Sequence, residues 1–523
     1  MLIFTICATF DAARGFIGMI PQAADSWTLR EAAHLLNRAA FGGSPDAIKA
    51  LHALGRKAAV DSLLSAQEAS DSVPMPEWAN KDQALVELKS QRDNARQMKM
   101  ASRDLSPEKA EKTRRELRRE MQMQDRQRGA EAQSWWVNRM LRTKAPLREK
   151  MTLFWHDHFA TSIQKVNQPI IMVWQNDLFR RHTTGSFKSL THAVLLDPAM
   201  MRYLDTQDSQ KGKPNENFAR EIMELFTLGE GHYTENDIRE AARAFTGYRF
   251  NPDTGSVMHV KRRWDETPKT IFGKTGNFDG ADVIDLIFDQ PQTAKFMAGK
   301  IWEFFVYENP PPKAVDVLAD TLRSANYELA PLLREIFLSK EFYSETTMST
   351  QIKCPIQFII QLHKELEIDQ PPKGFAQNAQ QQLGQVLFRP PNVAGWDWGK
   401  SWINTNTLLA RYNLAGVLCR STSKSEVMQP PRGKKIPRFA KMRSMAPEHS
   451  GPDYEKIAPA ALRENPEKLV ESLVLRFFHG PLPANASTSF IEYAQSKKGT
   501  SFTDKQVAEL CHLMLSTPHY QLC

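Results

Sequence analysis

The amino-acid sequence predicts a mainly α-helical protein: an irregular multi-helix domain with a protruding charged helical hairpin and a small C-terminal helical unit. Two patterns lead to this expectation. Apolar residues recur with a period near 3.6 along most of the chain from residue 27 onward. Residues that cap helices or suit their first turn stand where these patterns begin. Hydrophobic residues make up 41% and charged residues 24% of the 523 residues, which is typical of a globular protein.

Residues 1–26 are expected to be unstructured or to include a wrongly assigned start. The apolar stretch 2–10 resembles the central part of an export signal, but no basic residue precedes it and Asp11 ends it early. Alternatively, Met19 is the true first residue. The protein would be cytoplasmic in that case, and exported if residues 1–25 form a signal. No apolar run is long enough to span a bilayer, so we expect a soluble protein without an integral membrane segment.

The main helical domain is predicted over residues 27–415. Its first helix should begin near Trp27, where apolar residues start to follow the helical period. Ser44 and Pro45 predict the start of the second helix, because serine can accept a hydrogen bond as the N-cap and proline suits the first helical position.

A charged helical hairpin is predicted over about residues 82–130. Between residues 87 and 128 the chain has thirteen Lys or Arg and eight Asp or Glu residues, so much of the net charge of +8 is concentrated there. Ser106 and Pro107 should divide the stretch into two helices. Acidic residues are interspersed with the basic ones and aromatic residues are absent. We therefore expect a solvated, ion-paired arm and no binding of nucleic acid.

Helices are expected in succession from residue 147 to 245, with a helix start at Thr234 and a stop at Gly247. A short irregular or β segment is predicted over residues 248–273. Helices should resume at residues 282–288 and 293–307.

Residues 416–456 are predicted to form a linker, because they include few apolar residues and several prolines. The C-terminal helical unit that follows, residues 457–523, is similar to residues 300–343. In both, a Phe-Phe pair precedes a proline-containing loop and a helical stretch, which ends in Leu-Ser shortly before a tyrosine. Such a duplication indicates a repeated structural unit more readily than a catalytic function.

The first candidate functional residues are His156 and His158. In a strand they would face the same way and could share a metal ion. The apolar neighbours predict a helix instead, on which the two side chains lie about 160° apart. His158 should then face the interior, and His156 should join Glu149 and Thr152 on a polar side. A core histidine with one hydrogen bond is the alternative to a functional role for His158.

The second candidate group lies on a predicted helix over residues 215–226. Glu216 and Arg220 are four residues apart, and Glu221 lies beside them. Carboxylates at such spacing suit an acid–base pair or a metal site in a helical bundle. An exposed ladder of ion pairs has the same spacing, and Arg220 between two acidic residues favours it.

Tryptophans 396, 398 and 402 follow a proline-rich turn. They could stack on a sugar or another planar ligand, although packing in the core is the commoner reason for such a cluster. The five cysteines are scattered, without the spacing of a disulfide framework or a zinc site. No phosphate-binding glycine loop and no nucleophile elbow occurs. The sequence therefore identifies neither a cofactor nor a metal ion.

Five motifs occur in the order that characterises one bacterial family, at residues 35–42, 155–159, 215–228, 233–247, and 390–396 with 402–404. Over roughly residues 27–413 the chain thus resembles the family called domain of unknown function 1800. Its last residues, 517–523, look like those of planctomycete or verrucomicrobial members. The resemblance implies a bacterial, helix-rich protein, with a protein of the domain of unknown function 1501 family as a candidate partner. It implies no established activity.

The resemblance also affects the candidate residues, because His156, His158, Glu216, Arg220 and Glu221 match signature positions of the family. It therefore favours a functional site over a purely solvated ladder. Many members have a His-Asp pair where this chain has Trp-Asp at residues 264–265, so no mechanism that needs that histidine applies unless another histidine replaces it.

The leading hypothesis is that these motifs meet in a polar pocket. His158 or His156 would act with Glu221 or Glu216 as acid–base or metal-binding groups, in a hydrolytic or metal-assisted reaction. Arg220 would bind an anionic group of the ligand. The alternative is a non-catalytic helical scaffold or interaction protein. Whether the chain is an enzyme is left open by the sequence.

Overall fold

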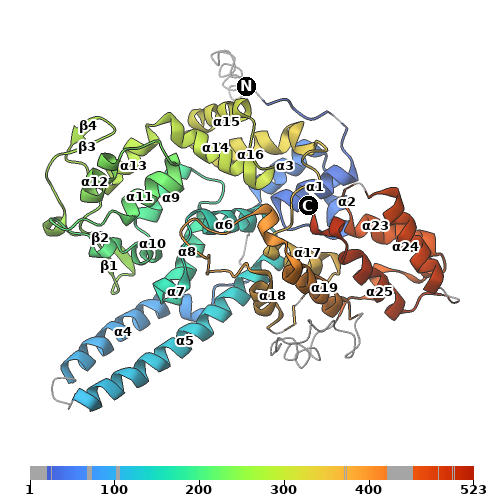
Figure 1. Ribbon diagram of the computed structural model, residues 1–523, viewed down its shortest axis with the longest axis horizontal. Coiled ribbons are helices and arrows are strands. Elements are labelled where there is room, and N and C mark those ends of the chain that lie inside the picture. Colours follow the sequence, from blue (N-terminus) through green and yellow to red (C-terminus); the bar gives the residue numbers. More distant parts are fainter. Residues whose placement is uncertain are drawn as a thin grey trace, which may run out of the picture.

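The computed structural model describes residues 20–24, 26–66, 73–101, 107–369, 371–372, 374–420, 451–480, 482–497, 499 and 501–523. Within these residues the protein is mainly α-helical, as predicted (Figure 1). The expectations for residues 1–19 and most of the predicted linker fall outside the described residues. Residues 20–24, which belong to the stretch expected to be unstructured, contact the helical body. Ile20 is buried, its backbone N–H donates to Glu335 at 3.1 Å, and Gln22 pairs with Ser339.

In the first part of the chain, the second helix begins where Ser44 and Pro45 predict it. Ser44 accepts a hydrogen bond from the backbone N–H of Ala47 at 3.3 Å, and Pro45 is the first residue of the second helix. The helices of this part are α1 (Leu29–Ala39), α2 (Pro45–Ala53), α3 (Arg56–Ser65), α4 (Lys81–Ala101), α5 (Pro107–Arg142), α6 (Pro146–His158), α7 (Ile163–Val166) and α8 (Pro169–Arg181), with a 3-10 helix at Glu77–Ala79.

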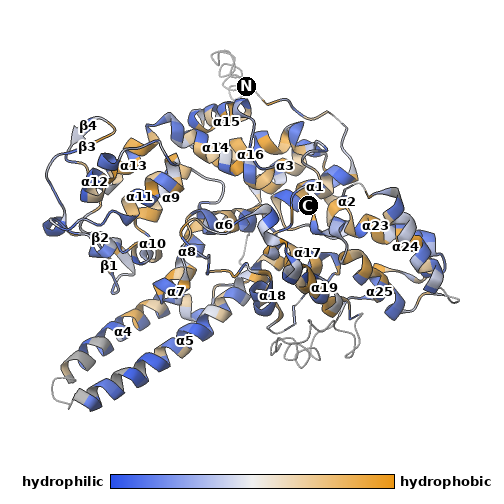
Figure 2. Cartoon of the chain, in the orientation of Figure 1, coloured by the Kyte–Doolittle hydropathy of each residue, from blue (hydrophilic) through white to orange (hydrophobic). Residues whose placement is uncertain are grey.

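Helices α4 and α5 project from the body as an arm, which is largely hydrophilic (Figures 1 and 2). An ion pair between Arg128 and Glu87 joins the two helices. The 36-residue α5 also enters the body, because Trp136 and Val137 near its end are buried in the main core. One continuous helix therefore connects the arm to the core.

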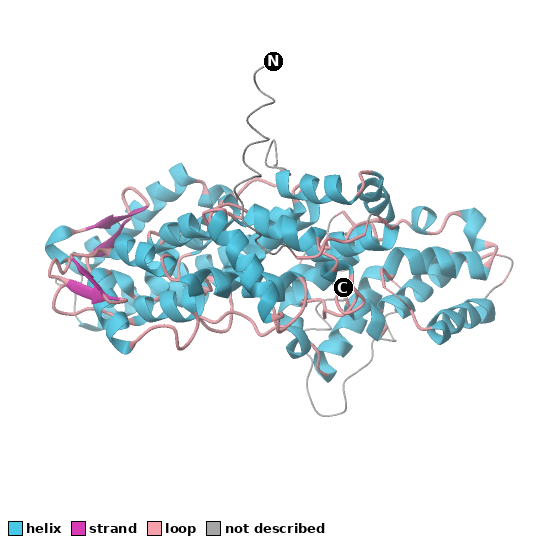
Figure 3. Cartoon of the chain, turned by 90° about the horizontal axis from the view of Figure 1, so that it is seen from above, coloured by secondary structure: helices cyan, strands magenta, loops and turns pink. Residues whose placement is uncertain are grey.

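The middle of the chain combines short helices with the only strands of the described residues, which lie together at one end of the molecule (Figure 3). Strands β1 and β2 form one antiparallel pair, in which Tyr248 lies opposite His259; β3 and β4 form another. The elements are α9 (Phe187–Leu195), α10 (Pro198–Tyr203), α11 (Asn217–Met223), a π-helix (Glu224–Leu228), α12 (Glu235–Ala244), β1 (Tyr248–Asn251), β2 (Ser256–His259), β3 (Lys269–Ile271), β4 (Lys274–Gly276), α13 (Gly280–Phe288), α14 (Pro291–Phe305), α15 (Pro312–Ser324) and α16 (Leu329–Leu338), with 3-10 helices at Thr206–Asp208, Lys261–Arg263 and Glu341–Tyr343.

The remaining helices pack around a second hydrophobic core. This core includes side chains from the helices on both sides of residues 421–450, so the C-terminal unit rests on the helices that precede it. Its elements are α17 (Pro355–Glu365), α18 (Phe375–Leu383), α19 (Thr405–Cys419), α21 (Tyr454–Ile457), α22 (Ala460–Arg463), α23 (Pro466–Phe477), α24 (Ala484–Lys497) and α25 (Asp504–Leu515), with 3-10 helices at Gly399–Trp402 and Pro518–Gln521. Because α19 ends at Cys419, the first residues of the predicted linker are helical.

The two stretches compared in the sequence have the same order of elements. Three α-helices, α14 to α16, precede a 3-10 helix that contains Tyr343. Likewise α23 to α25 precede a 3-10 helix that contains Tyr520. None of the helices in the described part of the chain combines the length and the apolar character needed to cross a bilayer.

Candidate functional site

Helix α6, which carries the two candidate histidines, is mostly buried. Glu149, Thr152 and His156, which were expected together on a polar side of the helix, do not face solvent, because each of them is at most 1% exposed. Glu149 accepts hydrogen bonds from Arg139 at 2.8 Å and from Arg180 at 2.6 Å. Burial alone would raise the pKa of Glu149, but the two arginines lower it. The polar residues of α6 thus belong to an internal network.

His156 supports the loop that follows α18. Its Nε2 atom accepts a hydrogen bond from the backbone N–H of Phe388 at 3.0 Å. Phe388 has a left-handed backbone, with φ at 61°, which a large side chain rarely adopts without support. Burial lowers the pKa of His156 to about 3, so the ring is neutral and its proton lies on Nδ1. His156 therefore positions the loop, and it does not line the cleft that its neighbours Asp157 and His158 border.

Asp157 holds the next part of the same loop. One carboxylate oxygen accepts from the backbone N–H of Trp396 at 2.8 Å, and the other accepts from Nε1 of Trp398 at 2.6 Å. Gly395, whose φ is 85°, packs against Asp157 so closely that a Cβ atom would lie 2.6 Å from the Asp157 carbonyl oxygen. Glycine is required here both for the backbone conformation and for the contact.

His158 connects α6 with the segment after α11. Its Nε2 atom lies 2.9 Å from the carbonyl oxygen of Phe226, so Nε2 carries the proton and donates. Phe226 belongs to the π-helix Glu224–Leu228, a local widening of the helix that is frequent at functional sites. Burial, together with the charge of Lys300, lowers the pKa of His158 to about 3. The ring is neutral, and its Nδ1 atom is left as an acceptor.

Asp157 and His158 border a cleft of about 700 Å³. Burial raises the pKa of Asp157 to about 7, against the opposing effects of its hydrogen bonds with Trp396 and Trp398. A carboxyl group that titrates near neutral pH in a cleft is a candidate for acid–base chemistry. The other polar or aromatic residues of the lining include Lys300, Glu303, Phe304, Tyr307, Glu308, Trp396, Asp397, Trp398 and Lys400.

The loop that carries the tryptophans forms one wall of this cleft. Trp396 and Trp402 are each 5% exposed, whereas Trp398 is only half-buried and borders the cleft. Gly399 packs on the carboxylate of Glu308, as Gly395 packs on Asp157. Two glycines thus bring the Trp-Asp-Trp segment into contact with two acidic side chains.

The other three candidate residues are placed elsewhere. Glu216, Arg220 and Glu221 do not line this cleft. Arg220 forms two hydrogen bonds of 2.8 Å with Glu235 on α12, and it lies 3.6 Å from Glu216. The predicted single helix over residues 215–226 is not regular, because α11 ends at Met223 and a π-helix follows from Glu224.

Burial raises the pKa of Glu221, and the neighbouring Glu224 raises it further. Glu224 accepts a hydrogen bond from the hydroxyl of Tyr233. Of the candidate residues, then, only His158 borders the cleft, His156 is buried behind it, and the acidic residues with Arg220 lie on the α11–α12 face. Among the described residues, no three His, Cys, Asp or Glu side chains lie close enough together to hold a metal ion.

Sequence reasoning missed Asp157, although it lies between the two histidines that were singled out. Its partner Trp396 is 239 residues away along the chain, and no local pattern links the two positions. The only available signal was that both motifs, residues 155–159 and 390–396, belong to the ordered set of five.

A family model described as "Protein of unknown function (DUF1800)" matches residues 34–522. The match extends beyond residue 413, to which the resemblance was traced, and includes the C-terminal helical unit. No curated protein and no solved structure matches the chain. Because the family model covers nearly the whole chain, the protein belongs to the DUF1800 family, whose function is unknown.

Proposed function

We propose that the cleft binds an uncharged, hydroxyl-rich ligand such as a polysaccharide segment, and that Asp157 is the acid–base group of its hydrolysis. The observation that carries this proposal is the position of Asp157, a carboxyl group with a pKa of about 7 at the wall of a cleft of about 700 Å³. A cleft of this size accommodates a small-molecule ligand or a short stretch of a polymer.

The lining supports a neutral, polar ligand. Two lysines and three exposed or half-buried carboxylates, in addition to Asp157, surround the cleft, so their charges nearly balance and no strong field selects an ion. The half-buried ring of Trp398 and the ring of Tyr307 offer apolar surfaces beside hydrogen-bonding groups. Aromatic surfaces with polar neighbours are suited to the faces and the hydroxyl groups of a sugar.

The proposed reaction uses two carboxyl groups, as glycoside hydrolysis commonly does. Asp157, partly protonated near neutral pH, donates its proton to the glycosidic oxygen as the bond from that oxygen to the anomeric carbon breaks. Water attacks the anomeric carbon and loses a proton to Glu303 or Glu308, both of which line the cleft. His158 presents its Nδ1 atom as an acceptor for a ligand hydroxyl group.

The test is to incubate the purified protein with a panel of soluble polysaccharides, measuring reducing ends and the thermal shift on binding. Asp157→Asn should lower hydrolysis by at least about 100-fold, the usual contribution of a general acid or base, while binding is kept. Trp398→Phe should weaken binding. Asp289→Asn, at an exposed carboxylate paired with Lys274, is the matched control and should change neither.

The pH profile gives an independent readout, because hydrolysis should decline as the pH rises through about 7 and Asp157 loses its proton. If Arg220→Gln abolishes activity and Asp157→Asn does not, the reaction belongs to the group formed by Glu216, Arg220 and Glu221. If no polysaccharide binds and Asp157→Asn changes only stability, the proposal fails and the non-catalytic scaffold is the better account.

A further inference from the structure

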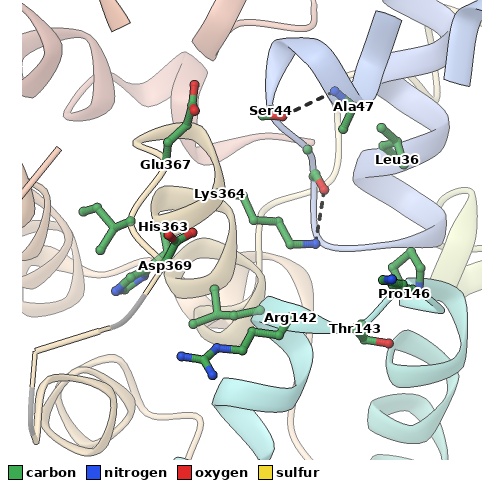
Figure 4. Close-up of a pocket in the computed structure, with 15 residues that line it drawn as sticks. Leu36, Ser44, Ala47, Arg142, Thr143, Pro146, His363, Lys364, Glu367 and Asp369 are labelled. Carbon is green, nitrogen blue, oxygen red and sulfur yellow. Dashed lines mark hydrogen bonds between the residues drawn. The ribbon is translucent and has the colours of Figure 1, made fainter. Parts of the chain in front are cut away.

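A second cavity, of about 800 Å³, lies between the N-terminal helices and α17 (Figure 4). Its walls are the loop between α1 and α2, the end of α5 with the residues after it, and the end of α17. None of its lining residues belongs to the cleft at Asp157. The chemistry of the two cavities is therefore independent.

Lys364 extends from α17 across this cavity (Figure 4). Its ammonium group lies 3.5 Å from the carbonyl oxygen of Gly42, which is longer than an ordinary N–H···O hydrogen bond of about 2.7–3.2 Å. No carboxylate of the described residues forms an ion pair with it. Burial, together with repulsion from the buried Lys150, lowers the pKa of Lys364 to about 8. Lys364 is half-buried, and a partly desolvated ammonium group without a counter-charge is unfavourable, so a bound anion would offset that cost.

The rest of the lining is compatible with an anion. Arg142 and Lys144, at and just beyond the end of α5, are exposed on the wall. The N-terminus of α2 lies on the same wall, and the backbone dipoles there favour negative charge. The lining has two acidic residues. Glu367 is already engaged, because Arg476 lies 2.8 Å from it and Lys456 also pairs with it, and Asp369 is exposed.

We infer that this cavity binds a phosphate group, either free or carried by a small organic molecule, with Lys364 as the central cation. The phosphate oxygens accept hydrogen bonds from the Lys364 ammonium group, and Arg142 adds a second positive charge at the rim. The cavity volume exceeds that of a phosphate ion, so a small phosphomonoester fills it better than the free ion does.

The test is to titrate the full-length protein with inorganic phosphate and, separately, with glycerol 3-phosphate, by calorimetry at constant ionic strength. Lys364→Met should weaken binding at least tenfold, and Lys364→Arg should keep it within a few-fold. Because Lys364→Met removes a half-buried charge that has no carboxylate partner, it should leave the melting temperature unchanged or raised. Lys274→Met removes one charge at an exposed site that does not line the cavity, and it should bind as the wild type does.

A further readout is the pH dependence, since affinity should fall as the pH rises through about 8 and Lys364 loses its proton. Tighter binding of glycerol 3-phosphate would assign the site to a phosphomonoester, and equal binding would assign it to free phosphate. Absence of saturable binding of either, or equal binding by Lys364→Met, would overturn the inference. The basic residues would then serve only to compensate the C-terminal dipoles of α5 and α17.

Discussion

Gly395→Ala tests whether the close contact between the tryptophan loop and Asp157 is a real constraint. Gly395 has a φ of 85°, which costs a residue with a Cβ atom about 1–2 kcal/mol. The added Cβ would also lie 2.6 Å from the Asp157 carbonyl oxygen and 3.0 Å from its Cγ atom. Neither atom can move without disturbing α6, so an overpacking cost of about 1–3 kcal/mol is added. The total loss should be about 2–5 kcal/mol.

The control is Gly384→Ala, at a position with a φ of 90° and open space where the Cβ would be. Gly384→Ala therefore has the energetic cost of the left-handed backbone but no close contact of the added Cβ atom. Both variants would be unfolded in urea and followed by tryptophan fluorescence, to which Trp396 and Trp398 beside the substitution contribute. The excess loss in Gly395→Ala measures the contact with Asp157. Equal losses in the two variants would refute the packing described for the loop.

Three further predictions concern charge. Glu149→Gln should lower the free energy of unfolding by about 3–5 kcal/mol, because it removes the buried carboxylate charge with which the guanidinium groups of Arg139 and Arg180 both pair; a loss below about 1 kcal/mol in urea denaturation would contradict this. Asp157 has a raised pKa, so its stabilising contribution is present below pH 4 and lost as the pH rises through 7. The stability of the wild type relative to Asp157→Asn should therefore fall by about 1.4 kcal/mol per pH unit between pH 4 and 7, and a constant difference would count against the raised pKa. Arg220→Ala should leave the unfolding midpoint unchanged within error, because its ion pairs are exposed; a large shift would indicate a buried role.

Local signals in the sequence were sufficient to predict where several helices begin. Ser44 with Pro45 starts α2, and Pro107 starts α5. Thr234 caps α12 through a capping box with Asp237. These predictions succeeded because each depends on residues within one turn of each other, whose hydrogen bonds form whatever the rest of the chain does.

The candidate site could be predicted only in part, because a helical wheel reports which residues share a face and not what covers that face. The wheel separated His156 from His158 correctly, and the two rings bond to different segments. It placed Glu149 on a polar side of the helix, but it could not show that Arg139 and Arg180 from two other helices cover this residue. It also treated residues 215–226 as one regular helix, and a π-helical turn has no sequence signature of comparable strength.

The three consecutive residues His156, Asp157 and His158 also bear on when the cleft can form during synthesis. The partners of the first two, Phe388 and Trp396, are 232 and 239 residues further along the chain. While the chain is emerging from the ribosome, neither of these partners has been synthesised when α6 appears. The polar groups at the end of α6 therefore lack these hydrogen bonds in a partly folded intermediate. A chain truncated before residue 388 should therefore expose the end of α6 and depend on chaperones to remain unaggregated.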